Sequence, residues 1–162
     1  MKENHFKIVR DTTSDLSYRE PNTYVQARVF DDSLKKFFDE QERHGVAYFP
    51  SDCDGVLLLN LSAFTKGLVM IFERIEKGTP KTITAKREDT AFTLTITIDG
   101  DPPKRRDLAA ISKVMYMAGF ALSTYGNVII LSTEISRRMI LSLYQHEVND
   151  IYGRLYLDFM FL

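Results

Sequence analysis

Residues 54–100 read DGVLLLNLSAFTKGLVMIFERIEKGTPKTITAKREDTAFTLTITIDG. Ser51 and Asp54 have capping-box spacing, and Gly78 followed by Pro80 is a stop signal, so we predict a helix from residue 54 to residue 78. Between these signals apolar side chains recur at steps of three or four and form a stripe that must be buried. The stripe consists of Leu57, Leu61, Phe64, Leu68, Ile71 and Ile75.

A β-hairpin is predicted directly after this helix, with strands at 81–87 and 92–98 and a turn at 88–90. In the second strand, four apolar residues alternate with threonines, which is typical of a strand with one dry and one wetter face. The apolar residues are Phe92, Leu94, Ile96 and Ile98. Asp99 and Gly100 then end the strand in a turn.

Bulk properties exclude several classes of function. A chain of 162 residues, 44% of them hydrophobic, can bury a core and is most simply one domain. A net charge of −1 and a pI near 6.3 give no electrostatic case for binding nucleic acid or an anionic membrane. The sequence contains neither a bilayer-spanning apolar run nor a signal peptide, so we expect a cytoplasmic protein. The single cysteine, Cys53, excludes an internal disulfide and is expected to be semi-buried in the first turn of the helix.

The remaining pattern indicates an α+β fold. Residues 1–22 are expected to be an N-terminal segment that docks on a partner chain, with a weak strand at 6–9, and residues 23–162 form the domain. Helices are predicted at 32–44 and 107–122, and strands at 24–30, 46–49, 128–133, 138–143 and 154–161. This order favours a two-layer α/β sandwich, with a mixed, mostly antiparallel sheet and helices on one face.

The order of elements resembles the ATP-binding catalytic domain of sensor histidine kinases, the GHKL-type ATPase fold. The resemblance covers roughly residues 24–162. It is carried by LLLNL at 57–61, Gly78-Thr79-Pro80, the hairpin through 86–89, and Ile98-Asp99-Gly100-Asp101-Pro102, followed by the helix and strand at 108–133. The resemblance implies that Asp99, with Gly100 beside it, matches the aspartate that reads the adenine amino group. An ordinary turn is the alternative interpretation of this pair.

Other groups that hold ATP in that family are not matched. The family's magnesium-binding asparagine should fall near residues 70–73, but Asn60 lies about two to three turns too early. Glu73 could present an oxygen there or be a surface glutamate. The segment between Asp99 and Asp107 is too short for the family's lid, and Gly119 lies late in the following helix, so a backbone cradle for phosphates is not expected.

Two functions follow from these observations. The first is a degenerate histidine-kinase-like domain that has lost ATP turnover and acts as a regulatory or protein-interaction module, with no cofactor and no catalytic residue. The alternative is an active but divergent ATPase or kinase domain that uses ATP and magnesium. In this alternative Lys104, Arg105 and Arg106 bind phosphate by charge; otherwise they are a solvated linker.

Expected partners are proteins, with neither nucleic acid nor membrane among them. A second copy is one such partner, because the aromatic C-terminal strand could form a sheet edge. No metal site is predicted, since His5, His44 and His146 lack ligand spacing, and His146 is expected to lie in a loop.

Overall fold

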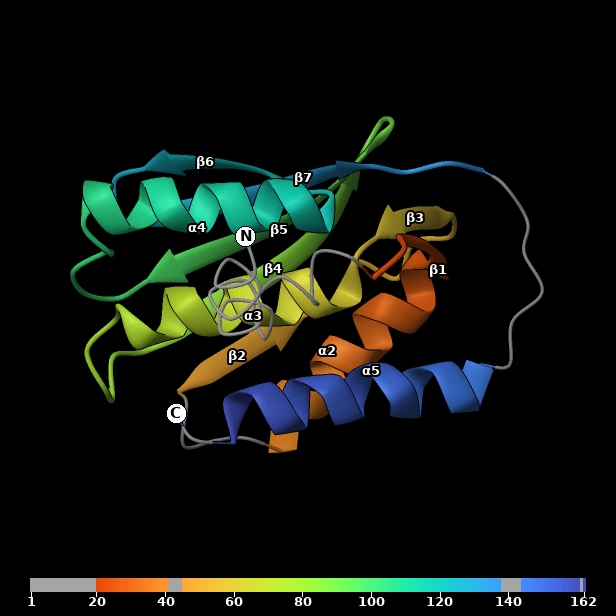
Figure 1. The fold of residues 1–162 in the computed structure, drawn as a ribbon, viewed down its shortest axis with the longest axis horizontal. Helices are drawn as coiled ribbons and strands as arrows, with labels where there is room; N and C mark the ends of the chain where they lie inside the picture. Colours follow the sequence, from red (N-terminus) through yellow and green to blue (C-terminus); the bar gives the residue numbers. More distant parts are fainter. Residues whose placement is uncertain (1–19, 41–44, 138–143, 161) are drawn as a thin grey trace, which may run out of the picture.

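The computed structural model describes residues 20–40, 45–137, 144–160 and 162, and contains two sheets (Figure 1). The larger sheet has the strand order β2-β4-β5-β7-β6, in which β2 and β4 are parallel and all other neighbours are antiparallel. Its strands are β2 (Val46–Phe49), β4 (Lys81–Glu88), β5 (Ala91–Ile98), β6 (Ala121–Tyr125) and β7 (Val128–Glu134). The smaller sheet pairs β1 (Thr23–Gln26) with β3 (Val56–Leu59).

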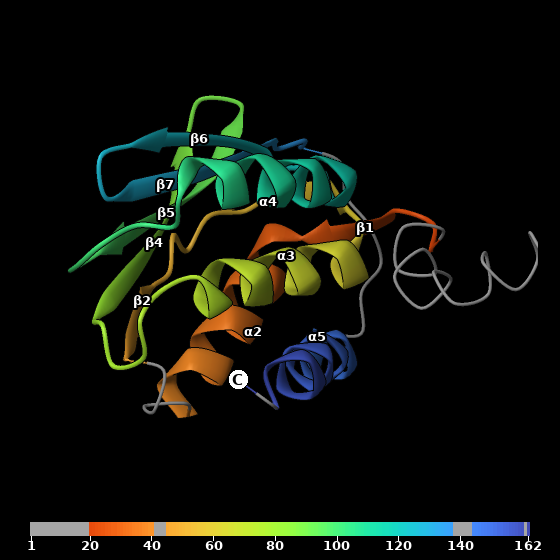
Figure 2. The same ribbon diagram turned by 60° about the vertical axis from the view of Figure 1, so that its left-hand side comes forward.

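Four helices lie on one side of the larger sheet (Figure 2). They are α2 (Ala27–Glu40), α3 (Leu61–Glu73), α4 (Arg105–Ala118) and α5 (Tyr144–Phe159). Helix α3 packs against α4, whereas α5 packs against α2 and α3 on the side away from the sheet. The predicted α+β sandwich with helices on one face is therefore confirmed, with α5 added outside it.

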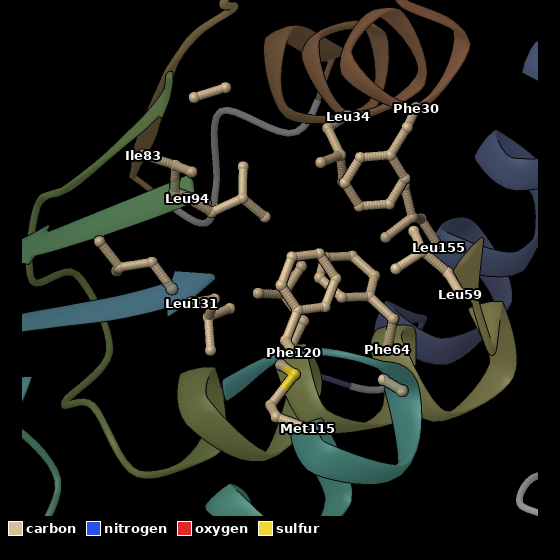
Figure 3. Packing of buried hydrophobic residues seen from close by; sticks show 14 of the residues in the cluster. Phe30, Leu34, Leu59, Phe64, Ile83, Leu94, Met115, Phe120, Leu131 and Leu155 are labelled. Atoms are coloured by element: carbon tan, nitrogen blue, oxygen red, sulfur yellow. The ribbon is translucent and has the colours of Figure 1, made fainter. Parts of the chain in front are cut away.

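The core lies between the sheet and α2, α3 and α4. The alternation in β5 is confirmed, because Phe92, Leu94, Ile96 and Ile98 are all buried, while Thr97 on the opposite face is exposed. Three rings meet at the centre: the Phe64 ring lies 5.0 Å from that of Phe30 and 5.3 Å from that of Phe120, measured between centroids (Figure 3). These rings join α2, α3 and the segment before β6.

The long helix spans Leu61–Glu73 and not residues 54–78, so both ends of that prediction are wrong. Gly55 has φ +124°, which is not helical, and residues 56–59 form strand β3. Asn60 is the helix cap, since its Oδ1 accepts a hydrogen bond from the Ala63 N–H at 3.0 Å. A short run of apolar residues fits a buried strand as well as a helix, and pairing with β1 decides for the strand.

The C-terminal region also differs from the prediction. Residues 154–161 were predicted as a strand, but residues 144–159 form α5, so His146 lies in a helix and not in a loop. The buried residues of α5 are Val148, Ile151, Leu155 and Phe159, spaced by three or four positions. Leu157, which completed the apparent alternation, is 64% exposed. The predicted strands at 6–9 and 138–143 lie outside the described residues.

Boundaries of α2 and α4 also differ from the prediction. Strand β1 ends at Gln26, where α2 begins, so the strand expected at 24–30 and the helix expected from residue 32 are both shifted. Helix α4 ends at Ala118, because Gly119 adopts φ +106° as its C-cap, and the predicted continuation to residue 122 is instead the start of β6. Among the described helices, none combines the length and the apolar character that crossing a membrane requires.

Candidate functional site

Asp99 and Gly100 lie at the end of β5, in an exposed bend beside the turn that precedes β4. The Asp99 N–H donates to the Pro80 carbonyl at 2.9 Å. A Cβ added at Gly100 would lie 2.8 Å from the Thr79 methyl carbon, so a side chain at this position would force a shift of Thr79. The pair therefore forms a fixed corner between the two hairpin strands and the Gly78-Thr79-Pro80 turn.

Residues 99–104 connect this corner to α4 and contain Pro102 and Pro103. Helix α4 starts at Arg105, with Lys104 as its N-cap residue and Asp107 in its first turn. The predicted helix start at residue 107 is therefore two residues late, and Arg105 and Arg106 belong to the helix rather than to a linker. All three basic side chains are exposed at this helix end, where the backbone dipole also favours anions.

Helices α3 and α4 lie side by side in both views and are held together by side chains (Figures 1 and 2). A Cβ on Gly67 would lie 2.8 Å from the Met115 Cε, so the end of the Met115 side chain packs directly over the backbone of residue 67. Near the Asp99 corner, Arg74 Nε lies 3.5 Å from Asp107 Oδ1. This ion pair joins the C-cap of α3 to the first turn of α4.

The end of α3 offers a single oxygen-bearing side chain at residues 70–73, that of Glu73, which is exposed. Ile71 and Phe72 in the same turn are buried. Asn60 has a structural role at the other end of α3, where it is 1% exposed and its amide also donates to the Glu20 carbonyl at 2.9 Å. The structure therefore brings Glu73 and Asn60 to opposite ends of α3.

A second polar cluster surrounds Asp31, a buried carboxylate on α2 that sequence reasoning missed. Its Oδ1 accepts a 2.7 Å hydrogen bond from the Tyr48 hydroxyl. Its Oδ2 accepts bonds from the Ser51 N–H at 2.7 Å, the Ser51 hydroxyl at 2.6 Å and the Asp52 N–H at 3.2 Å. One carboxylate thus fixes the loop between β2 and β3. The sequence does contain a signal that Asp31 is buried, because residue 31 lies four positions after Ala27 and three before Leu34, on the apolar face of α2.

Cys53 lies in this loop and not in a helix, although it is half-buried as expected. The Ser51 hydroxyl lies 3.1 Å from the Cys53 Sγ. Within the described part of the chain, no group of three or more His, Cys, Asp or Glu side chains could hold a metal ion.

The Asp31 cluster predicts a loss of stability in alkali. Burial, followed by the neighbouring Asp31 charge, raises the pKa of Tyr48 well above its ordinary value. The folded state therefore keeps the Tyr48 proton above pH 10, where the unfolded state loses it, so stability falls as pH rises beyond about 10, by up to about 1.4 kcal/mol per pH unit. Urea unfolding between pH 8 and pH 11 measures this slope. Tyr48→Phe should lower the slope, and an equal slope in both proteins would contradict the assignment.

The five-stranded sheet with α2, α3 and α4 on one face has the fold of a histidine kinase ATP-binding domain. The same arrangement occurs in solved sensor histidine kinases. The histidine kinase AdeS from Acinetobacter baumannii has a TM-score of 0.50 at 13% identity, covering 84% of this chain and 82% of that chain. A likeness at this identity shows the fold of histidine kinase ATP-binding domains.

Two further structures share this likeness. A histidine kinase from Burkholderia phymatum STM815 has a TM-score of 0.48 at 10% identity, covering 82% of this chain and 80% of that chain. The ATP binding domain of PrrB from Mycobacterium tuberculosis has a TM-score of 0.46 at 12% identity, covering 74% of this chain and 100% of that chain. No protein-family model matches this chain, and no curated protein matches its sequence significantly.

Proposed function

We propose that this chain is a histidine-kinase-like ATPase-fold domain that has lost ATP turnover and acts as a regulatory or protein-interaction module. The observation that carries the proposal is the α3–α4 contact beside Asp99. The Arg74–Asp107 ion pair joins these helices at the first turn of α4, and Met115 packs between them against Gly67 about 12 Å further along α4. The connection at 99–104 is too short to cover a nucleotide, and its prolines cannot supply backbone N–H groups to phosphates.

The side chains at the end of α3 support the same proposal. A magnesium ion bridging the phosphates of ATP prefers oxygen ligands, and residues 70–73 supply only Glu73. A carboxylate at this position would add negative charge beside a triphosphate when no metal is bound. The domain would then act through its surfaces, with another protein as its partner.

The ATP test uses thermal unfolding of the whole chain with and without Mg-ATP. A ligand present at 100 times its Kd stabilises a folded protein by about 2.7 kcal/mol, which raises Tm by about 5–10 °C for a chain of this size. We expect no rise in Tm at millimolar Mg-ATP, and no binding heat by calorimetry with or without magnesium. A clear rise in Tm that depends on ATP would refute the loss of nucleotide binding.

The active alternative is favoured by one observation, the exposed Lys104, Arg105 and Arg106 at the start of α4, next to the Asp99 corner. These cations could bind a triphosphate by charge alone. This alternative requires phosphate release above background, with a loss of that release in Asp99→Asn. Phosphate release that Asp99→Asn leaves unchanged would point to a contaminating ATPase.

A further inference from the structure

Strand β6 forms an open edge of the five-stranded sheet. Among the described strands it pairs only with β7, and Figures 1 and 2 both place it at the margin of the molecule. Its sequence, ALSTY, contains no charged residue and no proline, which are the usual means of blocking pairing at an edge. The opposite edge strand, β2, is followed at once by Pro50 and contacts α2.

The hairpin between β6 and β7 determines which backbone groups of β6 point outward. Tyr125 pairs with Val128 across a two-residue turn, in which Gly126 has φ +61°. The residues that close such a turn exchange hydrogen bonds with each other. Because hydrogen-bonding direction alternates along a strand, Ala121, Ser123 and Tyr125 bond to β7, whereas the N–H and C=O groups of Leu122 and Thr124 face outward.

We propose that β6 is a self-association edge, which pairs antiparallel with β6 of a second copy of this chain. A two-fold axis at Ser123 places Leu122 opposite Thr124 of the second copy, and Thr124 opposite its Leu122. The four outward-facing backbone groups of each strand then bond to their counterparts. The two sheets become one continuous sheet.

The side chains of β6 are self-complementary in the same register. The axis places Ser123 opposite its own copy, so two small polar side chains meet at the centre. Tyr125, which is 82% exposed, lies opposite the small Ala121 of the second copy, and a large side chain beside a small one fits a close strand pair. No charges oppose each other within the paired strands. A second copy can therefore form hydrogen bonds with the outward-facing backbone groups of β6, and no partner of different sequence is needed.

Exposed apolar groups on the neighbouring helix extend this edge. Helix α4 contacts β6, and its last turn exposes Tyr116 (80%) and Met117 (52%). Since the axis runs perpendicular to the sheet, the α4 helices of the two copies lie on the same side of the joined sheet. The inference does not depend on whether ATP binds at the Asp99 corner, although the turn after β6 reaches the start of that corner, where Asn127 bonds to Ile98.

Sedimentation equilibrium of the full chain tests this inference. We expect the mass to rise with concentration from 18.7 kDa towards twice that value, over a range up to about 1 mM, because a small interface gives weak association. Ser123→Lys and Ser123→Glu should each stay at the monomer mass, since like charges would meet at the axis. An equimolar mixture of the two variants should recover the dimer.

Two controls keep this experiment decisive. The circular dichroism spectrum and Tm of each variant at low concentration should match those of the parent, because Ser123 is exposed. If a lysine variant fails to fold, Thr124→Pro replaces it, since this change removes an N–H that faces away from β7. A parent chain that stays monomeric over the whole range would overturn the inference. A dimer that persists in Ser123→Lys would also overturn it.

Discussion

Phe64→Ala is expected to lower the free energy of unfolding by about 3–5 kcal/mol, which is the usual cost of removing a buried phenylalanine ring. Phe64 is fully buried, and its ring contacts those of Phe30 and Phe120. Because these three rings come from different elements, a cavity at Phe64 weakens several contacts at once. Neighbouring side chains on α3 and β5 are themselves tightly packed and can fill little of the space.

Phe49→Ala is the matched control, because it removes the same ring from a side chain that is 53% exposed on β2. We expect this variant to lose less than about 1.5 kcal/mol, since much of its ring already contacts water. Urea unfolding of both variants and the parent at one protein concentration gives the comparison. Equal losses in the two variants would mean that Phe64 does not lie at the centre of the core.

Sequence patterns predicted the hairpin and the fold class because both depend on local information. The alternation of Phe92 to Ile98 with threonines has one interpretation, and two apolar strands separated by a short polar turn must pair. The hydrophobic pattern did not decide the structure of Val56–Leu59, because four consecutive apolar residues fit either a buried strand or a helix. The secondary structure of residues 56–59 is decided by Thr23–Gln26, which lies far away in the sequence and supplies the paired strand.

The C-terminal helix shows how two periods can coincide in one segment. Leu155 and Phe159 are two steps apart in a strand pattern and four residues apart in a helix pattern. Only the earlier residues Val148 and Ile151 separate the two interpretations, and they were not included in the predicted strand. The decisive contacts are those with α2 and α3, which no local pattern reveals.

The candidate site was predicted only in part. The position of Asp99 and Gly100 at the end of β5 followed from the turn signal, and the structure places them there. The Arg74–Asp107 ion pair could not be predicted, because it links side chains on two helices that are distant in the sequence. The role of Asp99 and Gly100 in nucleotide binding stays a prediction.

Asp31→Asn should destabilise the protein by about 3 kcal/mol, although it preserves the shape of the side chain. Asp31 is 1% exposed, and both of its oxygens accept hydrogen bonds. An asparagine keeps one oxygen and replaces the other with a donor. Either Tyr48 or the Ser51–Asp52 backbone then loses its acceptor, and each unsatisfied buried donor costs about 1–3 kcal/mol.

Asp39→Asn on the same helix is the control for this change. Asp39 forms an exposed ion pair with Lys35 at 2.8 Å, four positions away in the helix, and such pairs contribute at most about 0.5 kcal/mol. Urea unfolding should therefore show a much larger loss of free energy of unfolding for Asp31→Asn than for Asp39→Asn, although both replace an aspartate on α2. If both cost the same, Asp31 does not hold the loop.

Cys53 provides a local measurement of the Asp31 loop, because it is the single cysteine of the chain. The Ser51 hydroxyl bonds to the Asp31 Oδ2 and lies 3.1 Å from the Cys53 Sγ, so the loop around the thiol is freed when the amide nitrogen of Asp31→Asn takes the place of Oδ2. The rate of Cys53 modification by a thiol reagent should rise in Asp31→Asn and stay unchanged in Asp39→Asn. A raised rate under conditions where both variants remain folded would show that Asp31 acts on the loop itself, since global unfolding would be negligible in each.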